Sequence, residues 1–160
     1  MKIPFLLNKE DQEYINQEKK HYENPKAASI EILKFIQNKY HWIPNHFINP
    51  IAKILHMSCS ELEEITTFYS QIFRKPIGKN IIRYCDSIVC YINNYKIIQK
   101  KLEKLLQIHP GQTTQNKQFT LLPTCCLGKC DKSPVIMINN HTYTNVTPKK
   151  LPILLDQYKL

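Results

Sequence analysis

The sequence predicts an α+β protein in which an amino-terminal helical bundle is followed by a smaller α/β domain. Up to about residue 75 the apolar residues recur at the spacing of amphipathic helices. Beyond that point, short runs rich in β-branched and aromatic residues indicate strands. Between the two patterns, Lys75-Pro76-Ile77-Gly78 interrupts regular structure. We therefore expect two domains, residues 1–75 and residues 76–160.

The composition indicates a globular chain and excludes several classes. The 160 residues are 42% hydrophobic and 10% aromatic, which is typical of a chain with a packed core. No apolar run approaches the roughly 18–20 residues that span a bilayer. The glycines are scattered. Dinucleotide fingerprints and phosphate-binding loops need clustered glycines, so we expect neither NAD nor ATP to bind through such motifs.

The net charge of +9 raises the question of nucleic-acid binding. Of the 22 basic residues, only Arg74 and Arg83 are arginine, and the lysines are dispersed along the chain. Base readout and bidentate phosphate contacts favour arginine. We therefore interpret the charge as a solvated surface, with a docking surface for an acidic partner as the second interpretation, and expect no nucleic-acid partner.

Helices account for the first domain. Residues 11–22 form a weak, exposed helix, and Asn24-Pro25 supplies a cap and a proline for a helix that runs to about Tyr40. A turn at 41–45 precedes a third helix, and the capping-box pattern Ser58–Glu61 begins a fourth. The residues expected on the buried faces are Ala28, Ile32, Phe35, Ile36, Phe47, Ile51, Leu62, Ile65 and Phe68.

Strands and helices alternate in the second domain. We expect strands at 80–84, 119–122, 134–138 and 141–144, and helices at 91–106 and from about 147 to 158. Ile97, Ile98, Leu102 and Leu105 would form the buried face of the first of these helices. The order β-α-β and then β-β-α is that of a thioredoxin-like domain, with a cysteine loop in place of its second helix.

Five of the six cysteines fall into two clusters. Cys85 and Cys90 form a C-x4-C motif; in the second cluster Cys130 pairs with Cys126 as C-x3-C or with Cys125 as C-x4-C. Each cluster directly follows a predicted strand. In a thioredoxin-like topology the two loops lie at the same end of the sheet, so that four thiolates can converge on one site.

Four converging thiolates suit more than one ligand. A [2Fe–2S] cluster takes two thiolates on each iron, whereas structural zinc favours short C-x2-C or C-x4-C knuckles, and neither pair is C-x2-C. The spacing favours iron–sulfur, with zinc, a disulfide or plain buried cysteines as alternatives. Gly128 allows the second loop to bend, while Cys125 competes with Cys126 as ligand. The isolated Cys59 is expected to be a buried small hydrophobic residue.

Several segments together resemble a known family. They are Thr67–Phe73 (TFYSQIF), Cys85–Cys90 (CDSIVC), Pro110–Thr114 (PGQTT) and Leu121–Asp131 (LLPTCCLGKCD). They resemble the E subunits of bacterial NADH-quinone oxidoreductase, the equivalents of the mitochondrial 24 kDa subunit of complex I. The resemblance extends from about Asn24 to Tyr158.

The resemblance implies a helical bundle followed by a thioredoxin-like domain that holds one [2Fe–2S] cluster. It also implies the ligands, which are Cys85, Cys90, Cys126 and Cys130, and so leaves Cys125 outside the ligand set. Lys129 is a mild departure from the family pattern, and it places a cation beside the cluster.

The same resemblance implies the function. The chain would exchange single electrons with FMN on a larger, NADH-binding partner subunit, in an arm of the complex on the cytoplasmic face of the membrane, with no catalytic residue of its own. One alternative is the small [2Fe–2S] subunit of an NAD-linked hydrogenase or formate dehydrogenase. An alternative of a different class is a zinc-stapled interaction module without a redox role.

Overall fold

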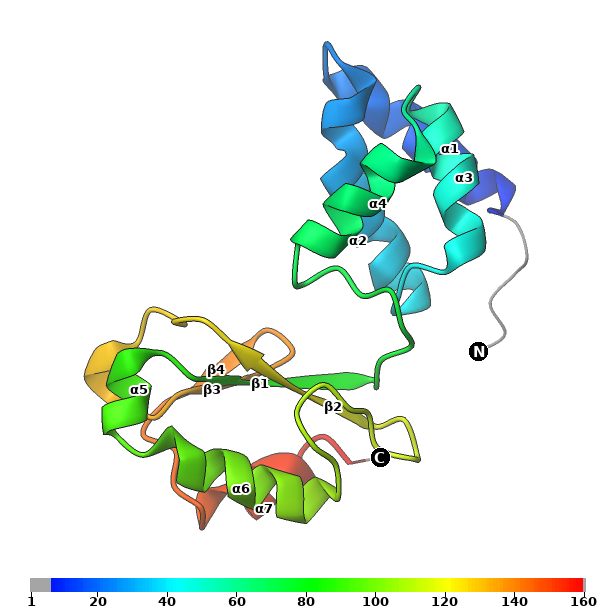
Figure 1. The fold of residues 1–160 in the computed structure, drawn as a ribbon. Helices are drawn as coiled ribbons and strands as arrows, with labels where there is room; N and C mark the ends of the chain where they lie inside the picture. The colour runs from blue at the N-terminus through cyan, green and yellow to red at the C-terminus, as the bar shows by residue number, and fades with distance from the viewer. Residues whose placement is uncertain (1–6, 160) are drawn as a thin grey trace. The chain divides into compact units, whose positions relative to one another are not determined.

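The chain divides after Pro76 into two compact units, Met1–Pro76 and Ile77–Leu160. The computed structural model describes residues 7–159 (Figure 1). Residues 1–6 and residue 160 lie outside the described residues. Each unit has its own buried hydrophobic cluster.

The first unit is helical, as predicted. Asn24 caps the short 3₁₀ helix Pro25–Ala28, because its side chain accepts a hydrogen bond from the Lys26 amide at 3.0 Å. The helices are α1 (Lys9–Glu18), α2 (Ser29–Tyr40), α3 (Asn45–Ile54) and α4 (Cys59–Phe68), and short 3₁₀ turns cover Lys19–His21 and Pro25–Ala28.

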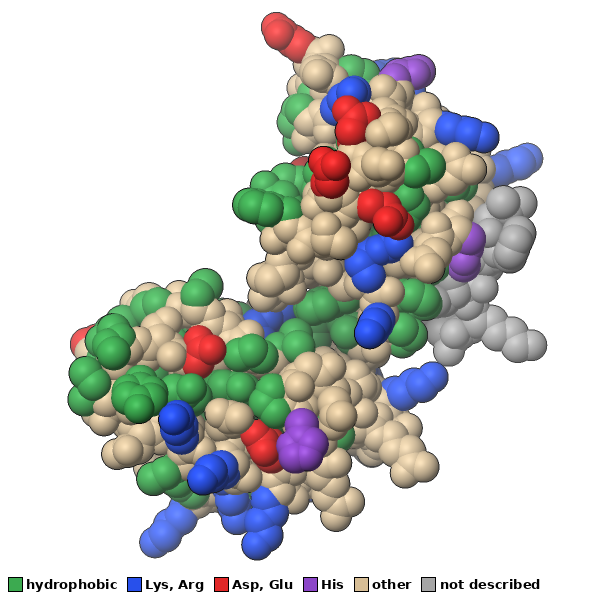
Figure 2. Space-filling view, viewed as in Figure 1, with side chains coloured by type: hydrophobic (Ala, Val, Ile, Leu, Met, Phe, Trp, Pro, Cys, Tyr) green, Lys and Arg blue, Asp and Glu red, His purple; other side chains and the backbone are tan. Residues whose placement is uncertain are grey.

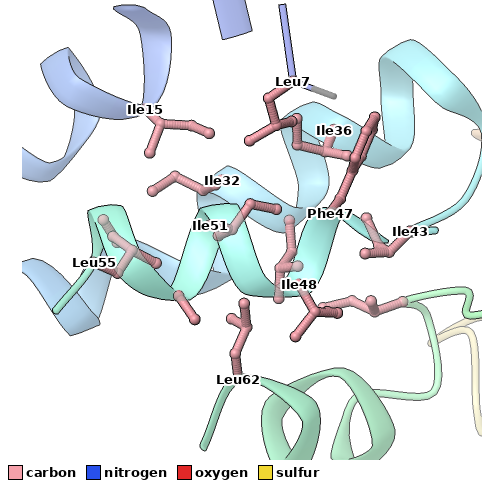
Figure 3. Close-up of a cluster of buried hydrophobic side chains, with 14 of the residues drawn as sticks. Leu7, Ile15, Ile32, Ile36, Ile43, Phe47, Ile48, Ile51, Leu55 and Leu62 are labelled. Carbon is pink, nitrogen blue, oxygen red and sulfur yellow. The ribbon is translucent and has the colours of Figure 1, made fainter. Parts of the chain in front are cut away.

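Side chains from all these helices meet in one core (Figure 3). Ile15 of α1, Ile32 of α2, Phe47 and Ile51 of α3 and Leu62 of α4 are each fully buried. Full burial of such a side chain contributes about 1.5–3 kcal/mol relative to leaving it exposed. This core therefore fixes how the helices pack within the first unit.

One buried carboxylate joins α1 to α2. Asp11 is fully buried; its Oδ1 lies 2.7 Å from Lys39 Nζ, and its Oδ2 accepts a hydrogen bond from the Tyr40 hydroxyl at 2.6 Å. Burial and then this hydrogen bond raise the pKa of Tyr40 to about 12. The hydrogen bond to Asp11 is also the main cause that raises the pKa of Lys39. The buried charge is thus paired and hydrogen-bonded, as a stable core requires.

The second unit is a four-stranded mixed sheet with the order β2-β1-β3-β4. Strand β1 (Asn80–Cys85) runs parallel to β2 (Phe119–Thr124) and antiparallel to β3 (Ile136–Ile138), which pairs with β4 (His141–Tyr143). Helices α6 (Tyr95–Leu106) and α7 (Lys150–Asp156) lie on the same side of the sheet (Figure 1). The predicted α+β class, with a thioredoxin-like second part, is confirmed.

The helix predicted for 91–106 is in fact two helices. α5 (Ile88–Ile92) ends at Asn93, and α6 begins after Asn94, whose φ of 60° is in the left-handed region. Asparagine tolerates this conformation better than most residues. Within α6, Ile98 and Leu102 are buried as expected, whereas Ile97 is 55% and Leu105 37% exposed.

The amino terminus of α4 generates a prediction about acid stability. Ser58 and Glu61 form a reciprocal capping box, and Lys26 Nζ lies 2.7 Å from Glu61 Oε1. The hydrogen bond from Lys26, followed by those of Ser58, lowers the pKa of Glu61 from 4.5 to about 2. Because the folded-state pKa is depressed, the stabilisation is present above about pH 4.5 and is lost as the pH falls towards 2.

We expect Glu61→Gln to flatten this part of the stability profile, since glutamine keeps the cap hydrogen bonds but not the charge. Urea unfolding between pH 7 and pH 2.5 would measure it. Glu64→Gln removes a charge from the same helix without touching the cap and should retain the acid-dependent loss. An unchanged profile for Glu61→Gln would contradict the prediction.

Gly78 generates a second prediction. A Cβ at this position would lie 2.7 Å from the backbone carbonyl carbon of Phe119, and the Gly78 amide donates to Thr120 Oγ1 at 2.6 Å. Because backbone cannot move aside cheaply, Gly78→Ala should destabilise the second unit by about 1–3 kcal/mol. Lys79→Ala, at the exposed neighbour, should change stability by less than about 0.5 kcal/mol. Equal unfolding midpoints for the two variants would refute the close contact.

Candidate metal centre

The two cysteine clusters leave the sheet at the same edge. β1 and β2 are parallel neighbours, and Cys85, the last residue of β1, lies opposite Thr124, the residue before Cys125. The pairing continues one residue further, where the Asp86 amide donates to the Thr124 carbonyl at 3.2 Å. The parallel register therefore brings the two loops together.

The first pair of thiols is buried. Cys85 is 2% and Cys90, on α5, is 1% exposed, and both pack with Val135. The Cys85 amide donates to the Val135 carbonyl at 3.1 Å. Burial, followed by a hydrogen bond with Cys85, raises the pKa of Cys90 to about 11, although a backbone hydrogen bond from Val135 acts in the opposite direction. This pair thus lies in a dry, apolar setting.

The second pair lies at the surface. Cys126 and Cys130 are exposed, and their Sγ atoms are 3.2 Å apart. Gly128 adopts a φ of +74°, and its amide donates to Cys126 Sγ at 3.3 Å. This hydrogen bond is the main cause that lowers the pKa of Cys126. The hydrogen bond between Cys130 and Cys126 is the main cause that raises the pKa of Cys130. Glycine suits this left-handed position, since other residues are strained there.

Packing and electrostatics connect the two pairs. Leu127 packs against the buried cluster of Cys85, Cys90 and Val135, which draws the second loop over the first. A hydrogen bond with Cys85 helps to lower the pKa of Cys126. The charge of Cys130 acts in turn on Cys90. The two thiol pairs therefore lie on loops that pack against each other.

The structure places the predicted site residues as two pairs on neighbouring loops, Cys85 with Cys90 and Cys126 with Cys130. Among the described residues, Cys125 takes no part in the contacts that link these four, and its thiol is exposed. The expectation that Cys59 is buried is wrong: it begins α4 on the solvent side, with Sγ 3.9 Å from Asn49 Oδ1.

Sequence reasoning missed the residues that hold the loops in place. Val135 and Leu127 pack on the buried thiols, and Asn93 Nδ2 donates to Ser133 Oγ at 2.6 Å, which ties the end of α5 to the segment before β3. The strand predicted for 134–138 includes Val135, but no local pattern indicates that its backbone faces both Cys85 and Cys90.

The donor set fits a binuclear cluster. All six cysteines are free thiols. Within residues 7–159, no three His, Cys, Asp or Glu side chains gather as a single metal ion would need. A [2Fe–2S] cluster instead takes two thiolates on each iron. The buried pair and the surface pair match this requirement in number and in chemical type.

Comparison with known proteins decides the family. The family described as thioredoxin-like [2Fe-2S] ferredoxin matches residues 15–159. The chain belongs to this family. Its cofactor is a [2Fe–2S] cluster, in agreement with the sequence-based expectation.

Relatives narrow the assignment. The chain is 54% identical to the E subunit of the NADH-quinone oxidoreductase of Buchnera aphidicola from Acyrthosiphon pisum over 157 residues, covering 98% of this chain and 97% of that protein. It is 53% identical to the E subunit of the Escherichia coli K12 complex over 155 residues, covering 97% and 93%. The chain is a member of this E-subunit family of an oxidoreductase complex.

A solved structure confirms the fold at lower similarity. A chain of an air-oxidised NAD+-reducing [NiFe]-hydrogenase superposes with a TM-score of 0.64 at 19% identity, over 71% of this chain and 20% of that chain. The matched part of this chain therefore covers about a fifth of the length of the hydrogenase chain. At this identity the likeness concerns the fold alone.

The burial of the thiols predicts their reactivity in the metal-free chain. Cys59, Cys125, Cys126 and Cys130 are exposed and should be alkylated in the native state. Cys85 and Cys90 should react at least about tenfold more slowly, because they are reached only through opening of the fold. Mass spectrometry after timed alkylation would show this, and denatured protein serves as the control. Equal rates for Cys85 and Cys59 would contradict the buried pair.

Proposed function

We propose that this chain is the electron-transfer subunit of NADH-quinone oxidoreductase and that Cys85, Cys90, Cys126 and Cys130 hold its [2Fe–2S] cluster. When bound, the cluster accepts and releases one electron at a time. The observation that carries the proposal is the placement of two thiol pairs on adjacent loops at the same edge of two parallel strands. The 53–54% sequence identity to E subunits, over nearly the full length of the chain, supports the same assignment.

In this proposal the protein controls the environment of the charge. Cys85 and Cys90 hold one iron in a pocket from which Val135 and Leu127 exclude water. The Gly128 amide donates to Cys126 and stabilises negative charge on the outer side. The exposed Lys129 acts in the same sense.

The partner in this proposal carries the hydride chemistry. We assign residues 1–75 to a helical bundle domain and residues 76–160 to the [2Fe–2S] domain, which exchanges electrons with FMN on the NADH-binding subunit. The lack of clustered glycines is consistent with NADH and FMN on another chain. Among the described residues, no helix is long and apolar enough to cross a membrane. We place the chain in an arm of the complex on its cytoplasmic face.

Serine variants of the vicinal cysteines test the ligand set. We expect Cys126→Ser to lose the native cluster, because it removes the thiolate that pairs with Cys130 on the second loop. Cys125→Ser, the matched control, should retain about two irons and two acid-labile sulfides per chain. Iron and sulfide analysis with electron paramagnetic resonance of anaerobically purified protein measures both. The reverse result would place Cys125 in the ligand set, and zinc alone would overturn the function.

A charge reversal tests the role of Lys129. Lys129→Glu exchanges an exposed cation on the cysteine loop for an anion and should lower the midpoint potential by about 10–40 mV, as expected for a screened charge. Lys79→Glu makes the same charge change just before the first residue of β1, at the end of the strand away from Cys85, and should shift the midpoint potential far less. Potentiometric titration followed by electron paramagnetic resonance would measure the midpoint potential of both variants. An unchanged or raised midpoint for Lys129→Glu would count against the role.

Co-purification distinguishes the related redox complexes. The tagged chain, expressed at its natural level, should bring down the flavin subunit and the membrane-arm subunits of NADH-quinone oxidoreductase. Hydrogenase or formate dehydrogenase subunits in their place would overturn the assignment.

A further inference from the structure

The helix that carries Cys90 exposes an apolar face. Ile88 is 69%, Tyr91 52% and Ile92 70% exposed, whereas Cys90 on the same helix is 1% exposed. The three exposed residues stand at i, i+3 and i+4 and so share one face of α5. Figure 2 shows hydrophobic side chains gathered over this end of the second unit. Scattered exposed hydrophobic residues are common, but a contiguous group indicates an interaction site.

This face, the α5 patch of Ile88, Tyr91 and Ile92, is held in place before anything binds. Cys90 anchors α5 from beneath, and the bond from Asn93 to Ser133 fixes its end. Lys96 Nζ lies 5.0 Å from the centre of the Tyr91 ring. A patch ordered in advance loses little conformational entropy on binding.

A basic stripe begins beside the patch at Lys96 and continues along α6. Lys96, Lys100 and Lys104 recur every four residues along α6 and are exposed, so they share one face of that helix. On the cysteine loops, Asp86 and Asp131 offset the charges of Lys129 and Lys132. An apolar centre beside a basic rim matches a protein surface with an apolar centre and an acidic rim.

We propose that the redox partner docks on the α5 patch and that the α6 lysines contact acidic residues at the rim of the partner's surface. This rests on the proposed function: a partner seated on α5 lies next to the helix that carries Cys90, so its redox group comes close to the thiol site. A second copy of this chain is a poor occupant. In a symmetric dimer the patch would face itself, and each partner carries a charge of +9.

A matched pair of variants tests the docking surface. Ile92→Ser removes a 70% exposed isoleucine from the patch, and Ile153→Ser removes a 66% exposed isoleucine from α7. The probe is the purified flavin-bearing subunit, with affinity measured on cluster-loaded chain. We expect Ile92→Ser to weaken binding about tenfold, Ile88→Ser with Ile92→Ser to weaken it further, and Ile153→Ser to remain within twofold. Iron and sulfide content should be equal in all of them.

The possible results distinguish failure of the docking surface from failure of the proposed electron-transfer function. Wild-type affinity in the double variant with an intact cluster overturns the docking surface and leaves the proposed function standing. A wild-type chain without iron and sulfide overturns the function and this inference with it. A dimer of the isolated chain, or binding to anionic phosphatidylglycerol vesicles, that Ile92→Ser abolishes would assign the patch to another occupant and overturn the proposal.

Discussion

The parallel pairing of β1 and β2 is the constraint on which the rest of the second unit depends. Neighbouring parallel strands end at the same edge, so Cys85 and the chain leading to Cys125 emerge side by side. Parallel strands need a crossover connection, and here α5 and α6 provide it. The same crossover carries Cys90 on its first turn. One topological requirement thus delivers both cysteine clusters to one place.

The two thiol pairs differ in environment, so that the centre has a buried side and a solvent-exposed side. One pair is packed among Val135, Tyr95 and Leu127, whereas the other is exposed and receives the Gly128 amide. Burial disfavours added negative charge, while amide donors and solvent stabilise it. The protein therefore treats the two ends of the thiol group unequally, with an inner side that shields and an outer side that stabilises charge.

Much of this was predictable because the signals are local. Strand runs, the capping box at Ser58 and the spacing of the cysteines each depend on neighbours in sequence. The misses depend on contacts across the chain or on single backbone angles. The left-handed Asn94 splits a helix that periodicity joins, and within α6 the sheet covers Ile98 but not the adjacent Ile97. The exposure of Cys59 and the packing of Leu127 on the buried thiols follow from tertiary structure, which no short pattern records.

In the proposed centre, each thiol pair binds one iron of the cluster. Anomalous diffraction at the iron edge from crystals of the loaded chain would locate the irons. We expect two iron positions, one bound by Cys85 and Cys90 and the other by Cys126 and Cys130. A single metal position shared by all four thiols, or an iron bound by Cys125, would contradict it.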